Sequence, residues 1–352
     1  MNIFSIIIVC NFYVYALILV YISFKAKKKG EIGAFINNLA NALILIISIS
    51  INLILITSFS TLKMEFIIFP FNILILVFIG LFLPIFYFFT SREKRKIIKL
   101  GQNKYSMKSP SSRELPLKFD IYRKLTHLVI LGIVFLYFTL GFYIKSFISF
   151  VPDFISNMFH TRGDIMYFTQ NLVIFLVGVS LIGLLTADFV RILNPDIYPL
   201  KPVNQLLREK ELGMRIGPHI SMSIGCFSII ILYGLIKPFG PVIICTSMTM
   251  AIFGDMASNL IGRTIGNKRI RDTKKTYEGL FAGIIVAFIT GIIILYLLRD
   301  FYFFNIFTIF LITIIGSLTM GLIDYLDLEI DDNLSYNFFI STIVFLITIL
   351  YI

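Results

Sequence analysis

The stretch from Gly254 to Gly279, GDMASNLIGRTIGNKRIRDTKKTYEG, carries polar residues at spacings that suit chemistry. Asp255, Asn259 and Arg263 recur every four residues, so a helix would place an acid, an amide and a guanidinium on one face. Asp255 falls within an apolar run, where a carboxylate is costly unless it faces protein, water or a metal. This polar face is therefore a candidate site.

A second face of the same expected helix consists of small residues. They again recur every four positions, and they are Gly254, Ser258, Gly262 and Gly266. Small residues at this spacing allow two helices to pack closely. They also allow a ligand to approach the backbone. The sequence leaves both interpretations open.

A basic loop follows this helix, and it contains Arg263, Lys268, Arg269, Arg271, Lys274 and Lys275. A helix end, a glycine-containing turn and several cations can hold a polyphosphate. A simple membrane flank would supply the cations but would not require the nearby acids Asp255 and Glu278 or the amide of Asn259. The loop is therefore a candidate phosphate site.

An acidic loop lies nearer the C-terminus, and its polar residues are Asp324, Asp327, Glu329, Asp331, Asp332 and Asn333. Asp324, Asp327 and Asp331 are spaced for one face of a helix. Such oxygen ligands suit Mg²⁺, which binds through one or two carboxylates plus substrate phosphates. Carboxylates, Mg²⁺, a polyphosphate and lysine together indicate phosphoryl or nucleotidyl transfer.

Two further groups of charged residues precede these loops. Arg123, Lys124 and His127 can share one helical face at the start of an apolar run. A basic membrane flank with a packing histidine is the alternative for this group. Asp188 and Arg191 are three residues apart, a spacing that predicts a structural ion pair.

The elements that must position these residues are apolar. Of the 352 residues, 58% are hydrophobic and 14% are charged, and apolar runs of about 20 residues recur along the whole chain. This pattern predicts an all-α, polytopic membrane bundle of ten helices. We expect the spans at roughly 2–24, 36–58, 66–90, 125–150, 167–187, 216–236, 239–262, 279–298, 303–323 and 334–352.

The basic residues support this count of spans. Most of the 31 Lys and Arg fall in alternate gaps between the runs, so we expect these gaps on the cytoplasmic face and both termini outside. The first run is followed by basic residues rather than preceded by them, so it is expected to be retained and not cleaved. Membrane topology and anionic lipid explain the net charge of +11, and nucleic-acid binding is not expected.

The polar composition divides the chain into three parts. Residues 1–90 form three spans with few charges, an expected accessory module. Residues 91–119 are basic and contain Ser and Pro, which predicts a flexible cytoplasmic linker. Residues 120–352 hold all the candidate sites. Within this part, 198–212 has the pattern of an amphipathic helix on the membrane surface.

Four motifs resemble those of a known family, in the same order. They are Arg123–Lys124–x–x–His127; Phe253 to Ser258 with Gly262–Arg263; Lys275–x–x–Glu278–Gly279; and Asp331–Asp332–Asn333–Leu334. Over residues 120–352 the chain resembles the polyprenol kinases, which include dolichol, phytol and farnesol kinases and a CTP-dependent diacylglycerol kinase. The chain has Thr276 and Leu280 where that family often has Ser, and Asp324 where it commonly has Glu.

This resemblance implies a membrane enzyme that phosphorylates a lipid alcohol, with CTP as donor and a divalent metal. The lipid alcohol would come from the bilayer, with dolichol or another polyprenol as the first choice. We expect Mg²⁺ to be held by Asp255, Glu278, Asp331 and Asp332. We expect the nucleotide to be bound by Gly254, Asn259, Arg263, Lys268, Lys275 and Gly279. His127 is the candidate base, and Lys124 and Arg123 would neutralise developing charge.

Two other functions fit part of the same pattern. A lipid-phosphate cytidylyltransferase would also use CTP, but the glycine–histidine and aspartate–arginine signature of CDP-lipid synthases is absent from the last loops. A transporter would have a site at the membrane midplane and paired broken helices. Here the polar residues gather at one face, which favours the kinase.

Overall fold

The structure is a computed structural model, and most of the residues that it describes are helical. It describes residues 2–58, 65–100, 128, 132, 133, 136–140, 143, 147, 165–236, 239–271, 273–299 and 304–351. Within these ranges no strand is present, and the one β-bridge joins Arg269 to Thr276. The all-α fold expected from the sequence is confirmed.

The long helices of the described residues have these bounds: α1 Ile3–Lys28, α2 Ile32–Ser58, α3 Phe71–Leu100, α8 Ile165–Leu193, α10 Pro218–Tyr233, α11 Phe239–Thr264, α12 Tyr277–Leu297, α13 Ile306–Leu326 and α14 Asp332–Tyr351. Eight of them are long and apolar enough to cross a membrane. The other is α10, which has 16 residues. The expected span at 125–150 lies mostly outside the described residues, which include a short π-helix, Leu136–Leu140.

Several helices begin at residues that suit the start of a helix. The side chains of Asn2, Thr276 and Asn305 each accept a hydrogen bond from a backbone N–H of the first turn, which satisfies a donor that lacks an intrahelical partner. Helix α10 begins with Pro218, whose missing N–H costs nothing at this position.

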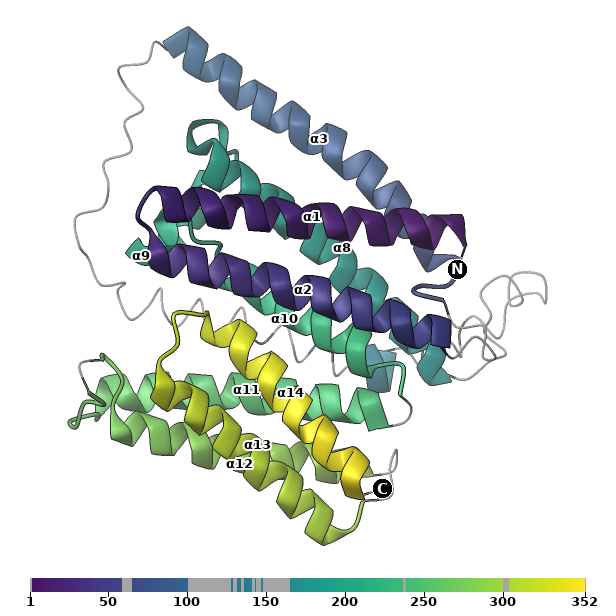
Figure 1. Cartoon of the computed structure of the whole chain (residues 1–352), viewed down its shortest axis with the longest axis vertical. Helices are drawn as coiled ribbons and strands as arrows, with labels where there is room; N and C mark the ends of the chain where they lie inside the picture. Colours follow the sequence, from purple (N-terminus) through teal and green to yellow (C-terminus); the bar gives the residue numbers. More distant parts are fainter. Residues whose placement is uncertain are drawn as a thin grey trace.

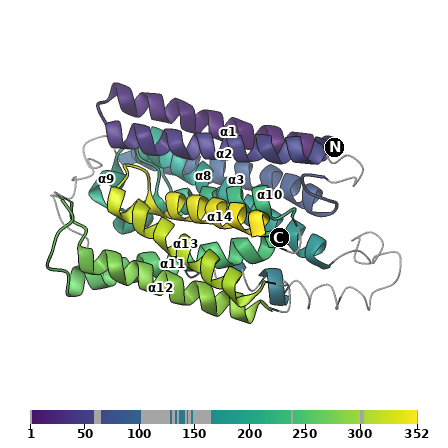
Figure 2. The same ribbon diagram turned by 60° about the horizontal axis from the view of Figure 1, so that its bottom comes forward.

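The loops that carry the charged motifs lie at one end of the bundle. Figure 1 shows the turn between α1 and α2, the short helix α9 (Glu209–Leu212), the α11–α12 loop and the α13–α14 turn all on the left. Both chain termini lie at the opposite end, and the rotated view in Figure 2 agrees. We call the first of these the loop end. Alternate gaps of the chain therefore meet in space, as the distribution of basic residues predicts.

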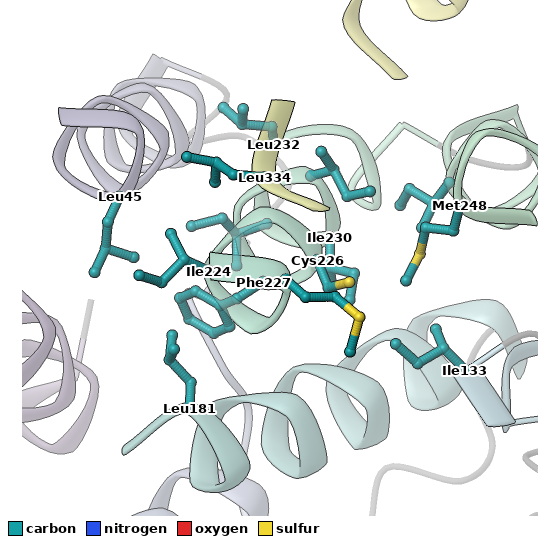
Figure 3. Packing of buried hydrophobic residues seen from close by; sticks show 14 of the residues in the cluster. Leu45, Ile133, Leu181, Ile224, Cys226, Phe227, Ile230, Leu232, Met248 and Leu334 are labelled. Carbon is teal, nitrogen blue, oxygen red and sulfur yellow. The ribbon is translucent and has the colours of Figure 1, made fainter. Parts of the chain in front are cut away.

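Helix α10 forms the centre of the core. It is apolar around its whole circumference and buried along nearly all of its length, as expected for a helix enclosed by others. Figure 3 shows Phe227 and Ile230 of α10 surrounded by side chains of α2, α8, α11 and α14, including Leu45, Leu181, Met248 and Leu334. Phe227 also packs on Phe12 of α1, with ring centroids 4.6 Å apart.

The first three helices share this core with the rest of the chain. Asn38 of α2 donates a hydrogen bond to the carbonyl of Met214 at 2.8 Å, and Asn52 donates to the carbonyl of Ile231 at 2.5 Å. Both side chains are buried. The N-terminal helices thus pack directly against the part of the chain that holds the candidate sites.

Two local expectations differ from the structure. Helix α3 continues to Leu100, so residues 91–100 extend a helix, and the rest of the expected linker, 101–119, lies outside the described residues. The predicted amphipathic helix at 198–212 is wrong. This part of the chain forms 3₁₀ turns at Pro195–Ile197 and Lys201–Leu206 and then α9, because the two turns contain prolines that cannot donate an N–H to a continuous helix.

The expected helical face of three aspartates is also wrong. Helix α13 ends at Leu326, and Asp327 adopts a left-handed conformation with φ 45°. This conformation ends the helix, so Asp331 comes after a turn. Asp324 therefore belongs to α13, whereas Asp331 lies in the turn before α14.

Candidate functional site

A pocket with a volume of about 50 Å³, open to solvent, lies at the loop end, between the segment before α10, the end of α11 and the α13–α14 turn. Its walls are mostly polar, and we call it the polar pocket. It is lined by Arg208, Lys210, Glu211, Arg215, Pro218, Asp255, Asn259, Asp327, Leu328, Ile330, Asp331, Asp332 and Asn333. Three segments that are far apart in the sequence therefore contribute charged groups to one pocket.

The polar face predicted for 255–263 partly lines this pocket. Asp255 is 4% exposed, and Asn259 lies one turn further along α11. The side-chain amide of Asn259 donates to Oδ1 of Asp255 at 2.6 Å and to its carbonyl oxygen at 2.9 Å. This bond fixes the orientation of the carboxylate. Arg263, the third member of the face, is exposed and does not line the pocket.

Asp331 faces the same pocket from the start of α14. Its Oδ1 accepts hydrogen bonds from the backbone N–H of Asn333 at 3.0 Å and from the Asn333 side chain at 2.7 Å. These are the contacts of a helix N-cap. The backbone N–H of Asp331 donates to Oδ1 of Asn37 on α2 at 2.8 Å. Asp331 therefore stabilises α14 and also presents a carboxylate to the pocket.

A second, compact group of charges overlaps the polar pocket, because Asp327 and Asp332 belong to both. Nζ of Lys275 lies 2.9 Å from Asp324, 3.0 Å from Asp327 and 3.6 Å from Asp332. We call these four residues the lysine cluster. Burial alone would lower the pKa of Lys275, but Asp332, Asp324 and Asp327 together raise it above its ordinary value. Lys275, predicted to bind phosphate, is thus engaged by three carboxylates.

Asp324 ties the lysine cluster to two other helices. Its Oδ2 accepts a hydrogen bond from Ser258 of α11 at 2.7 Å, and its Oδ1 accepts one from the hydroxyl of Tyr336 of α14 at 2.8 Å. With Lys275 before α12, four segments meet at one buried carboxylate. This arrangement is typical of a structural centre.

The small-residue face of α11 packs against α12 and α13. A Cβ on Gly279 would lie 2.6 Å from the carbonyl oxygen of Ser258 and 3.0 Å from Cα of Gly262, and one on Gly254 would lie 2.5 Å from Sδ of Met320. At Gly279 the contacts are with backbone and leave no room for a side chain, whereas at Gly254 the side chain of Met320 would have to move. Gly254 and Gly279, expected at the nucleotide, lie in these interhelical contacts, and neither lines the polar pocket.

The remaining predicted metal and phosphate ligands of the basic loop lie outside the pocket. Both carboxylate oxygens of Glu278 accept from the backbone N–H of Lys268 at 3.2 Å, and the Lys268 side chain is exposed. In the described part of the chain, no three His, Cys, Asp or Glu residues form a group that could hold a metal. The predicted four-residue Mg²⁺ site is therefore not assembled here.

Two carboxylates still fit a metal that arrives with a ligand. Asp255 of α11 and Asp331, directly before α14, line the same pocket. A Mg²⁺ ion bound to a polyphosphate needs only one or two protein carboxylates. The catalytic candidates Arg123, Lys124 and His127 lie outside the described residues.

The predicted ion pair between Asp188 and Arg191 is confirmed, and it supports one wall of the polar pocket. Both side chains are buried, and Nε of Arg191 donates to Oδ1 of Asp188. The same guanidinium donates to the carbonyl oxygens of Glu211 at 2.8 Å and Arg215 at 2.7 Å. Asp188 in turn accepts from the backbone N–H of Gly217 at 3.1 Å.

The sequence did not predict that the cations of this wall line the pocket. Arg208 and Lys210 stand in a run of alternating charges, and Arg215 directly precedes an apolar run, where basic residues are common. The one sequence feature that could have indicated these cations is the high density of charged residues in a short segment between two spans. It did not reveal that Arg215 would be buried.

Comparison with known proteins does not place the chain in a family. No family model matches it, and no curated protein and no solved structure is significantly similar to it.

Proposed function

We propose that this multi-pass membrane protein is a kinase that transfers the terminal phosphate of CTP to a lipid alcohol. The observation that supports this most directly is the convergence of Asp255, Asp331 and Arg215 on the polar pocket. They come from three distant segments, and they combine carboxylates for a metal with a cation for phosphate. The pocket opens at the end of a bundle of apolar helices, where a water-soluble nucleotide and a lipid hydroxyl can meet.

In this proposal the pocket binds the nucleotide as its Mg²⁺ complex. Asp255 and Asp331 would bind the metal, which neutralises phosphate charge. Arg208, Lys210 and Arg215 on the opposite wall would contact phosphate oxygens. Phosphoryl transfer depends mainly on positioning and charge stabilisation. The hydrogen bonds that fix Asp255 and Asp331 would contribute to positioning.

The proposed step is an in-line displacement. The lipid hydroxyl oxygen forms a bond to the γ-phosphorus, and the bond to the β,γ-bridging oxygen breaks, so that CDP leaves. The hydroxyl proton goes to a base, for which His127 is the candidate, with Lys124 and Arg123 beside the developing charge. The resemblance to polyprenol kinases is the basis for these three roles, for CTP as donor and for a polyprenol as acceptor.

One assay tests this proposal. The purified protein in lipid nanodiscs is incubated with Mg²⁺, CTP labelled in the γ-phosphate and a panel of prenols that includes dolichol. We expect label in a lipid monophosphate and release of CDP in equal amount. Pyrophosphate and a CDP-lipid would instead identify a cytidylyltransferase. Uptake of an anionic solute into proteoliposomes without any lipid product would indicate a transporter, and either result would overturn the kinase.

A further inference from the structure

Arg215 is a buried cation whose donors are mostly unused by the protein. It is 3% exposed and lines the polar pocket. Among the described residues its Nε has no hydrogen-bond partner. Its Nη2 reaches Oδ1 of Asn37 only at 3.4 Å, and its Nη1 lies 4.0 Å from Glu329, whose side chain is 65% exposed. A guanidinium has five N–H donors, and the contacts of Arg215 with the described residues leave most of this capacity unused.

Arg191 is a buried arginine with a purely structural role, and its contacts can be compared with those of Arg215. Its side chain is as buried as that of Arg215. Its guanidinium forms a two-point ion pair with Asp188 and donates to two carbonyl oxygens at 2.8 and 2.7 Å. A buried charge without such contacts is costly. The long contacts of Arg215 therefore indicate a group that is completed by a ligand.

The backbone around Arg215 is fixed on both sides by Glu31 of the α1–α2 turn, by α2 and by α8. Met214 donates its N–H to Glu31 at 2.8 Å and accepts from Asn38 at 2.8 Å. The N–H of Ile216 donates to the same Asn38 at 3.1 Å, and the carbonyl of Arg215 accepts from Arg191. The guanidinium is therefore held at a defined place before any ligand arrives, which lowers the entropic cost of binding.

We propose that Arg215 binds phosphate oxygens of a ligand in the polar pocket, and that Asn37 of α2 positions both walls of this site. Oδ1 of Asn37 contacts Arg215 on one wall and the backbone N–H of Asp331 on the other. More carboxylates than cations line the pocket, so a phosphate that carries a divalent cation is favoured over a bare anion. The identification of the ligand as a nucleotide rests on the proposed function, whereas the phosphate site does not.

The test measures binding without any lipid. Affinities of the full-length protein for Mg²⁺–pyrophosphate and for Mg²⁺–CTP are determined by titration calorimetry. Arg215→Gln is expected to weaken both by about 30-fold, the loss of charge-assisted hydrogen bonds. Arg95→Gln, at an exposed position of α3 outside the pocket, is the matched control and should change either affinity by less than about twofold.

A second variant covers the case in which Arg215→Gln does not fold. Asn37→Asp keeps the acceptor oxygen, and the Nδ2 that it removes has no partner among the described residues. The new carboxylate would pair with Arg215 and compete with phosphate, so we expect about tenfold weaker binding. Arg215→Lys, which keeps the charge but loses the planar fork, should fall between Arg215→Gln and the unchanged protein.

The outcomes separate this site from the proposed function. Unchanged affinity in Arg215→Gln, or in Asn37→Asp when the first variant is unfolded, would overturn the phosphate site. Pyrophosphate binding that depends on Arg215, in a protein that forms no lipid phosphate, would support the site and reject the kinase. Lipid phosphorylation that is unaffected by Arg215→Gln would support the kinase and reject the role of Arg215.

Discussion

Two groups of carboxylates lie on different sides of helix α11, and the two groups have different surroundings. On the side toward α12 and α13, Ser258 donates to Asp324, and Lys275 lies within 3.6 Å of three carboxylates. On the other side, Asp255 faces the polar pocket, and the buried cation of that pocket, Arg215, makes only long contacts. We call these the closed side and the open side.

This difference indicates that one side of α11 contributes to stability and the other to function. On the closed side, Lys275 is paired with three carboxylates, two of which also line the polar pocket, and the glycine contacts are close. On the open side, hydrogen bonds hold the carboxylate of Asp255 and the backbone of Arg215 in place, and both residues line the polar pocket. Buried charges with satisfied partners stabilise the structure, whereas buried charges left open indicate a ligand. The closed side should therefore affect the free energy of unfolding, and the open side should affect activity.

The largest effect is expected for Lys275→Met. It removes the cation that Asp324, Asp327 and Asp332 share. Of these three acids, Asp324 is buried. Removing one partner of a fully buried pair costs roughly 3–5 kcal/mol, and partial exposure of the other two acids reduces this to about 2–3 kcal/mol. Thermal unfolding in detergent measures it. Lys274→Met, at the exposed neighbouring position, should change stability by less than about 0.5 kcal/mol.

The next effect is expected on the open side. Asp255→Asn keeps the size of the side chain, so the melting temperature should fall by only a few degrees. If Asp255 holds the metal of a nucleotide complex, lipid phosphorylation should fall by about 100-fold or more. The nanodisc assay measures this change. A variant that is stable and has near-normal activity would show that the open side does not perform the chemistry.

A smaller effect should distinguish two glycines of the closed side. In Gly279→Ala the new methyl meets backbone atoms, so we expect a loss of about 1–3 kcal/mol. In Gly254→Ala it meets the end of the Met320 side chain, which can move, and the better helix propensity of alanine offsets part of the strain. Equal losses from chemical unfolding would show that the backbone contact at Gly279 is not tight.

The smallest effect concerns pH. Because the native pKa of Lys275 is raised above its ordinary value of 10.5, its stabilisation is fully present below that value and is lost only as the pH rises through the native pKa. The stability difference between the unchanged protein and Lys275→Met should therefore stay constant within about 0.5 kcal/mol from about pH 7.5 to about pH 9.5. A steady decrease over this range would mean that the lysine cluster does not hold the lysine proton.

The sequence by itself determined the apolar helices and identified some of the residues that line the polar pocket. The apolar runs fix helices because a bilayer leaves backbone groups no other partners. The spacing of Asp255 and Asn259 placed both on one face, and the spacing of Asp188 and Arg191 identified their ion pair. These are local relations within one helix, so the periodicity of the helix is enough to predict them.

Only the tertiary structure decided which charges are satisfied and which are left for a ligand. Lys275 and Arg215 are both cations in loops at the same end, and nothing local distinguishes them. Their roles follow from contacts with residues far away in the chain: Lys275 meets Asp324, whereas Arg215 meets Asn37 of a helix expected to be accessory. The balance between burial cost and available partners depends on packing between helices, which the order of residues along one chain does not display.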